Sequence, residues 1–189
     1  MTSEQLFSGG SWRGLARGLA VFWVFGGHAM ATTTAHSAKT HHSTSGTRTI
    51  AKFGDWRVAA HGQGASLVCY AYTRASKSAV LPGRGEVALT VTERPALRDS
   101  VAISAGFLLT TRGDVKLQVG NGTTLFYPGG RLVFARQGPA AIAMLGGGTS
   151  AELTLPSPKD GDLQDTFSLN GFTAALDAAR KACPVETYK

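Results

Sequence analysis

The sequence lacks the short motifs that most often identify an enzyme. It contains no Gly-x-Ser-x-Gly elbow, and the three glycines at 146–148 are not followed by the Lys-Ser or Lys-Thr of a phosphate-binding loop. His61 is the only histidine beyond residue 51, so few pairs of nucleophile and base are available. We therefore predict no catalytic residues, no cofactor and no enzymatic activity. A hydrolase that uses His61 is the alternative.

A metal site is not predicted either. His36, His41 and His42 form a short histidine-rich tract of the kind that sometimes binds metal ions. The surrounding residues 32–51 contain no carboxylate and no cysteine. They are rich in Thr and Ser with almost no large apolar side chain, which predicts a flexible, solvated linker.

Long apolar runs are scarce, and the clearest one lies within residues 1–31. Residues 19–25 are uninterruptedly apolar, follow the basic Arg13 and Arg17, and precede a small-x-small site that ends at Ala31. This order is typical of a secretory signal cleaved near Ala31. The run is shorter than the roughly 20 residues that a membrane-spanning helix needs. We expect an exported chain with no transmembrane span in its mature form; an uncleaved membrane anchor is the alternative.

Residues 52–187 are predicted to form one domain of ordinary size. They show no internal repeat and no alternation of strands with helices. Val115, Leu117 and Val119 alternate with polar residues and precede the turn Gly120-Asn121-Gly122, and similar short segments recur with turn signals roughly every 8–12 residues. The pattern predicts a mainly β fold: an antiparallel β-sandwich or barrel-like domain with one C-terminal α-helix.

The formal net charge is +7, but the charges are scattered and the longest basic run is Arg180-Lys181. A nucleic-acid-binding protein usually gathers its positive charge on one face or carries a known motif, so no nucleic-acid partner is predicted. Scattered positive charge favours weak contact with anionic surfaces such as lipid headgroups or envelope polysaccharide.

Residues 165–183, DTFSLNGFTAALDAARKAC, predict the closing helix. Either Ser168 or Asn170 is suited to the N-cap, because their side-chain oxygens can accept hydrogen bonds from first-turn amides. The residues that share one helical face recur at spacings of three and four; they are Phe172, Leu176, Ala179 and Cys183. Cys183 is therefore expected to point toward the surface on which the helix packs.

The chain has only two cysteines, Cys183 and Cys69, which lies in the apolar segment SLVCYAYT that predicts a buried strand. They are either two free buried thiols or a disulfide that ties the last helix to an early strand. Export to an oxidising compartment favours the disulfide. Such a bond would close a loop of more than a hundred residues and contribute roughly 4–5 kcal/mol in the chain-entropy account.

Aromatic residues gather near two arginines. Phe126, Tyr127 and Phe134 lie close in sequence to Arg131 and Arg136. Aromatic side chains beside arginine are typical of a binding rim, whereas a cross-strand aromatic pair fills a core. We interpret them as a core pair, with the binding rim as the alternative.

The segments FGDW at residues 53–56 and DTFSLNGFTAALDAARKAC, together with the strand cysteine Cys69, resemble the invasion-associated locus B family of exported alphaproteobacterial proteins. The resemblance covers about residues 52–184 and is strongest at its two ends. Many members carry an early cysteine in a W-x-V-x-C pattern. This chain has Ala60 at that place, so its cysteine pairing must differ from theirs.

The resemblance implies a protein that is periplasmic or associated with the outer membrane after signal cleavage. It implies no catalytic mechanism. The expected partner is an unknown protein or envelope component, and a link to host interaction follows from members implicated in host-cell entry. A structural periplasmic protein without a specific ligand is a further alternative.

Overall fold

The computed structural model describes residues 46–110, 112–157 and 161–185. By its internal contacts the chain divides into Met1–His41 and His42–Lys189, and every described residue belongs to the second unit. The predicted signal segment, most of the predicted linker and the histidine tract lie outside the described residues.

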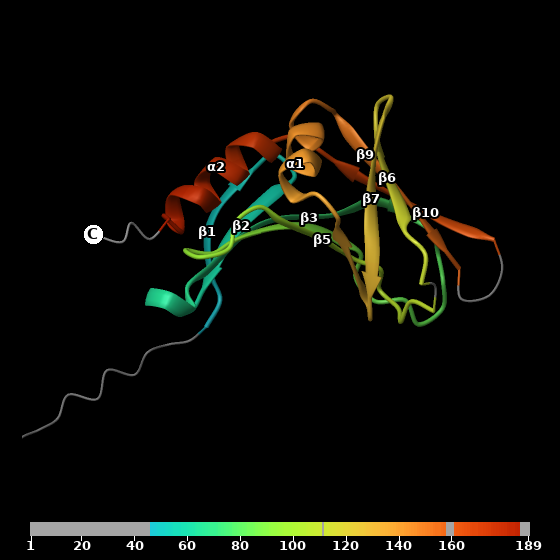
Figure 1. The fold of residues 1–189 in the computed structure, drawn as a ribbon, viewed down its shortest axis with the longest axis horizontal. Helices are drawn as coiled ribbons and strands as arrows, with labels where there is room; N and C mark the ends of the chain where they lie inside the picture. The colour runs from blue at the N-terminus through green and yellow to red at the C-terminus, as the bar shows by residue number, and fades with distance from the viewer. Residues whose placement is uncertain (1–45, 111, 158–160, 186–189) are drawn as a thin grey trace, which may run out of the picture. The chain divides into compact units, whose positions relative to one another are not determined.

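Within the described residues, ten strands and two α-helices make up this unit (Figure 1). The strands are β1 (Arg48–Phe53), β2 (Trp56–His61), β3 (Val68–Ser78), β4 (Ala88–Glu93), β5 (Ser100–Ser104), β6 (Val115–Val119), β7 (Gly122–Gly129), β8 (Leu132–Ala135), β9 (Ser150–Pro156) and β10 (Asp162–Ser168). The helices are α1 (Gly138–Gly146) and α2 (Phe172–Ala182).

Eight of the strands close into an antiparallel barrel. The sheet runs β1-β2-β3-β10-β9-β6-β7-β8-β5-β4, and an additional pairing of β4 with β3 closes the ring. The hairpin of β1 and β2 stays outside the ring and extends the sheet from the edge of β3. The predicted mainly β, antiparallel fold with a C-terminal helix is confirmed, and the barrel-like form of the prediction is the one observed.

The barrel core follows from the alternation of side chains along each strand. In β6, Val115, Leu117 and Val119 are buried, whereas the residues between them are exposed. Opposing strands supply equally large side chains, so the interior is filled as in other small barrels. The largest fully buried apolar residues of the barrel strands include Leu89, Ile103, Leu117, Phe126, Leu153, Leu155 and Phe167.

The two ends of the barrel are closed differently. At one end α1 packs against β5 and β7 and buries Ala141, Ile142 and Leu145. At the other end, the connection from β3 to β4 brings Arg84 onto Asp165 of β10 in a bidentate ion pair. Both side chains are almost fully buried, at 4% and 0% exposure. A buried charge needs such a partner, because desolvation alone would be costly.

The second helix, α2, lies along one side of β2 and β3 (Figure 1). Its predicted face is correct, since Phe172, Leu176, Ala179 and Cys183 are all buried. The ring of Trp56 packs edge-on against Phe172 with centroids 4.9 Å apart. The sheet therefore has an inner face that carries α2 and an outer face without a helix.

Two expectations about local structure, the N-cap of α2 and the start of the domain, were wrong. The N-cap of α2 is Gly171 in a left-handed conformation with no side-chain cap, and the Ser168 oxygen accepts instead from the backbone N–H of Asn170 at 3.3 Å. Besides the predicted C-terminal helix, the described residues contain a second one, α1. The domain begins with β1 at Arg48, four residues before the expected boundary at Lys52.

Gly171 is required for the junction between β10 and α2. Its φ is +90°, and a Cβ there would lie 2.1 Å from the carbonyl oxygen of Phe53. We expect Gly171→Ala to lower the free energy of unfolding by about 2–3 kcal/mol, from both the left-handed backbone and the clash. Gly130→Ala is the control, because Gly130 also has a positive φ but faces open space. Equal losses in urea denaturation of the two variants would show that the contact with Phe53 is unimportant.

No helix among the described residues is long and apolar enough to cross a membrane.

Candidate functional site

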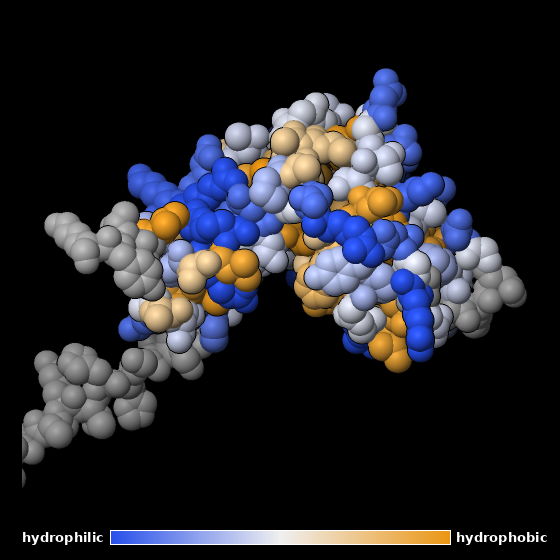
Figure 2. Space-filling model, in the orientation of Figure 1, coloured by the Kyte–Doolittle hydropathy of each residue, from blue (hydrophilic) through white to orange (hydrophobic). Residues whose placement is uncertain are grey.

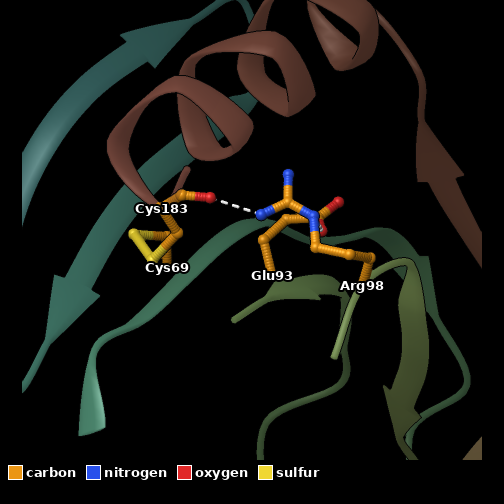
Figure 3. The surroundings of a disulfide bond; sticks show 4 residues. All are labelled: Cys69, Glu93, Arg98 and Cys183. Atoms are coloured by element: carbon orange, nitrogen blue, oxygen red, sulfur yellow. Dashed lines mark hydrogen bonds and ion pairs between the residues drawn. A yellow bond between two sulfur atoms is a disulfide. The ribbon is translucent and has the colours of Figure 1, made fainter. Parts of the chain in front are cut away.

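The two cysteines meet beneath the end of α2. Cys69 on β3 and Cys183 after α2 form a disulfide bond with their Cα atoms 5.8 Å apart, and both residues are fully buried (Figure 3). The bond joins positions separated by 114 residues. The bond fixes α2 on the inner face of the sheet. Because α2 packs on β2 and β3, it holds these two strands in place from behind their outer face.

A charged cluster lies next to the disulfide. The buried Glu93 carboxylate pairs with Arg98 at 2.9 Å and with Arg180 of α2 at 3.3 Å. Arg98 also donates to the carbonyl oxygen of Cys183 (Figure 3). Arg180 reaches Asp99 at 2.6 Å, and the backbone N–H of Asp99 donates to Glu93. The cluster thus attaches α2 to the connection between β4 and β5.

Burial raises the pKa of the Glu93 carboxyl above its ordinary value of 4.5, although the Asp99 N–H and the charges of Arg98 and Arg180 oppose this rise. The pKa of Arg180 is raised mainly by its hydrogen bond to Asp99. Burial thus makes the ionised form of Glu93 less favourable in the folded chain than in water.

We expect the charge of Glu93 to reduce stability as the pH rises. The pKa of Glu93 is higher in the folded than in the unfolded chain, so the protonated carboxyl stabilises the fold. This stabilisation is complete below about pH 4.5 and is lost as the pH rises through the folded-state pKa. Glu93→Gln removes this titration while keeping the shape. Urea denaturation from about pH 4 to about pH 7 should show the unmodified protein losing stability relative to the variant. A relative gain would mean that the arginines lower the pKa instead.

The outer face carries a groove where the sheet divides. On one edge, β3 pairs with β2 as far as Tyr72 and with β10 from Ala75 onward. The two partners diverge at residues 73–74 and leave an open groove of about 320 Å³. We call this the basic groove; it is lined by Lys52, Asp55, Arg57, Tyr72, Thr73, Arg74, Ser76 and Ser168.

Hydrogen bonds hold the walls of the basic groove together. The Thr73 hydroxyl donates to the Asp55 carbonyl at 3.0 Å, and the Ser168 hydroxyl donates to the Asp55 carboxylate at 2.6 Å. On the β10 side, the Ser76 hydroxyl donates to the carbonyl of Thr166 at 3.0 Å. The walls come from β1, β2, β3 and β10, so strands rather than mobile loops fix most of the lining residues.

The groove holds positive charge that the described chain does not neutralise. Lys52 and Arg57 stand directly opposite each other on β1 and β2, and both are exposed. Neither forms an ion pair with any residue that the structure describes, whereas Arg74 is paired with Glu86 at 2.7 Å. Like charges opposite each other destabilise a sheet. An anionic ligand would remove this repulsion and gain charge-assisted hydrogen bonds.

The other residues considered from the sequence lie apart from the basic groove. His61 is exposed at the end of β2, and within residues 46–110, 112–157 and 161–185 it has no hydrogen bond to a serine or a carboxylate. The described residues contain no group of three or more His, Cys, Asp or Glu that would hold a metal ion.

The expected aromatic core pair lies on the outside of the barrel. Phe126 is fully buried, but Tyr127 and Phe134 stack on the outer face with ring centroids 5.6 Å apart. The guanidinium of Arg136 lies over the Tyr127 ring. The pair is cross-strand as predicted, and its assignment to the core was wrong because Phe126 takes the inward position on β7.

Sequence reasoning did not single out Lys52 and Arg57. Lys52 was placed at the boundary of the domain, and the strand that carries it was not recognised. The pairing of β1 with β2 was the missing information, because it brings the two cations together.

In comparisons with known proteins, no family model matches the chain, and no curated protein or solved structure matches it significantly.

Proposed function

We propose that this chain is an exported, non-enzymatic protein of the invasion-associated locus B type that binds an anionic component of the cell envelope through the basic groove. The observation that carries the proposal is the pair of unneutralised cations, Lys52 and Arg57, on the wall of an open groove. The buried Cys69–Cys183 bond supports export, because disulfides persist mainly in oxidising compartments. The expected location is the periplasm or the outer membrane.

The serine and threonine hydroxyls that line the described part of the groove are already engaged in hydrogen bonds. In the described groove lining, the hydroxyls of Thr73, Ser76 and Ser168 donate to main-chain or carboxylate oxygens, and none has a histidine beside it. The groove offers three cations, hydroxyls, one half-exposed tyrosine ring and a single carboxylate, Asp55, which already accepts a hydrogen bond from Ser168. The excess of positive groups suits recognition of an oxyanion-bearing ligand.

Charge reversal at the groove tests the binding. Lys52→Glu with Arg57→Glu should reduce the amount of protein that sediments with a washed envelope fraction severalfold, because attraction becomes repulsion. Lys116→Glu with Lys181→Glu is the matched control, since it changes the net charge equally at exposed positions outside the groove. Equal losses in the two double variants would overturn the groove as the binding site and point to general charge attraction.

Export has a separate test. The intact mass of the protein from its native envelope fraction should begin at Thr32, and iodoacetamide should not react until a reductant is added. A mass that begins at Met1, with two alkylated thiols, would overturn the exported assignment.

A further inference from the structure

The basic groove continues into a row of side chains across the outer face of the sheet. Residues directly opposite in neighbouring strands have side chains on the same face. The residues that pair directly across neighbouring strands form one such row over seven strands, in the order β1, β2, β3, β4, β5, β8 and β7. Its members, in the same order, are Lys52, Arg57, Tyr72, Thr90, Ala102, Phe134 and Tyr127. We call this the outer row.

The chemistry of the outer row changes along its length. Two unneutralised cations stand at one end, the half-buried Tyr72 follows, and the Tyr127–Phe134 stack stands at the other end. Between the aromatic positions lie only Thr90 and Ala102, whose short side chains leave space above the sheet. Tyr70, on the adjacent row, lies 5.8 Å from Tyr72 and widens the first aromatic position.

The shape of the unit agrees with a ligand laid across the sheet. Figure 1 shows α2 on one side of β2 and β3, and Figure 2 shows the unit hollowed on the other side, between the part that contains β1 and β2 and the part that contains β7. Strands lie about 4.8 Å apart, so the path from Arg57 to Phe134 over four strand spacings is about 19 Å long. An extended chain of several units fits this length better than a single small anion.

We propose that the outer row binds an acidic glycan, a sugar chain that carries occasional carboxylate or phosphate groups; this rests on the proposed function and specifies its ligand. The acidic group would lie between Lys52 and Arg57 and form charge-assisted hydrogen bonds with both side chains. The apolar C–H face of a sugar ring would pack on Tyr72, and a later ring on Tyr127, by dispersion and burial of apolar area. The hydroxyl of Thr90 supplies a hydrogen-bonding group between the two aromatic positions.

The distribution of charge favours this ligand over other polyanions. A nucleic acid carries a phosphate at every unit and would need cations along the whole path. On the outer row the unpaired cations stand at one end only, and the arginine at the far end, Arg136, is already bound to Asp114. A sparsely charged chain with apolar ring faces matches this pattern.

Binding of oligosaccharides to the full mature chain, measured by isothermal calorimetry, tests the proposal. The probes are oligogalacturonates, which carry carboxylates, a phosphomannan, which carries phosphates, and neutral dextran oligomers. At least one acidic glycan should bind and dextran should bind much more weakly. Lys52→Gln with Arg57→Gln should weaken binding by about tenfold, from the loss of two charge-assisted contacts. Lys116→Gln with Lys181→Gln is the control and should change affinity by less than about twofold.

A second pair of variants tests the far end of the outer row. Tyr127→Ser should weaken the binding of long oligomers by about threefold or more and leave disaccharide binding unchanged. Leu125→Ser is matched in strand, face and exposure, at 42% against 41%, but Leu125 is not a member of the row. If both substitutions weaken the binding of long oligomers equally, the ligand does not extend along the outer row to Tyr127. Urea denaturation confirms that each variant is folded.

The results separate this inference from the proposed function. If neither acidic glycan binds while the Lys52→Glu, Arg57→Glu variant still loses its envelope association, the glycan assignment is overturned and the binding function stands. Preferential binding to vesicles of phosphatidylglycerol and phosphatidylcholine, or to single-stranded DNA, would also overturn the glycan assignment. If the groove variants retain full envelope association, the proposed function itself fails.

Discussion

Replacing Asp165 with alanine is expected to lower the free energy of unfolding by about 3–5 kcal/mol. The substitution leaves the Arg84 guanidinium buried at the barrel end without a counter-charge, since it is only 4% exposed and now binds Asp165 at 2.6 Å. Hydrogen bonds from Arg84 to Ser78 and to the carbonyls of Ala79 and Ala105 remain, but none of these acceptors is charged. Urea denaturation followed by tryptophan fluorescence measures the loss.

Two controls make the Asp165 result specific. Asp114→Ala removes a carboxylate that also holds an arginine through two 2.6 Å hydrogen bonds, but at the surface, and it should leave the urea midpoint nearly unchanged. Arg84→Met together with Asp165→Leu should recover most of the stability, because no charge remains buried. If Asp165→Ala loses no more stability than Asp114→Ala, the neutral hydrogen-bond acceptors around Arg84 are enough to stabilise its buried charge.

Removing the disulfide should have a comparable effect. The Cys69–Cys183 bond closes a loop with a sequence separation of 114, so chain entropy assigns it about 5 kcal/mol, and measured values are usually somewhat lower. We expect Cys69→Ala with Cys183→Ala to lower the free energy of unfolding by about 3–5 kcal/mol. Thermal and urea denaturation of both proteins, with and without reductant, measure this.

The reductant provides the internal control for the disulfide. It should lower the stability of the natural chain toward that of the double variant and leave the double variant unaffected. Retained stability of the double variant would mean that the Glu93 cluster and the apolar face of α2 hold the helix without the bond. The variant should also bind its ligand less tightly, because α2 supports the sheet behind the basic groove.

Patterns of local sequence predicted much of the fold. The alternation of Val115, Leu117 and Val119, followed by a glycine-rich turn, identified the β6–β7 hairpin because both signals act over a few residues. The spacing of Phe172, Leu176 and Ala179 identified the buried face of α2 for the same reason. The N-cap was missed because the close approach of Phe53 to Gly171 joins segments far apart in the sequence.

The candidate site was not predictable from such local patterns. The basic groove exists because β3 changes its partner from β2 to β10, and β10 lies about ninety residues beyond β3 in the chain. The outer row likewise depends on the register of seven strands. Single residues such as Lys52 or Thr90 give no indication of it, because their neighbours in the row are set only when the sheet assembles.

The position of β10 has a consequence for the order of events in assembly. The chain is synthesised from its N-terminus, yet β10, which lies between β3 and β9, is the last strand to be made. The ring therefore stays open until nearly the whole chain has emerged, with one edge of β9 and the part of β3 from Ala75 onward unpaired until then. Cys183 follows fifteen residues after the end of β10, so bond formation with Cys69 comes at completion. Formation of this bond therefore follows the synthesis of every strand of the barrel.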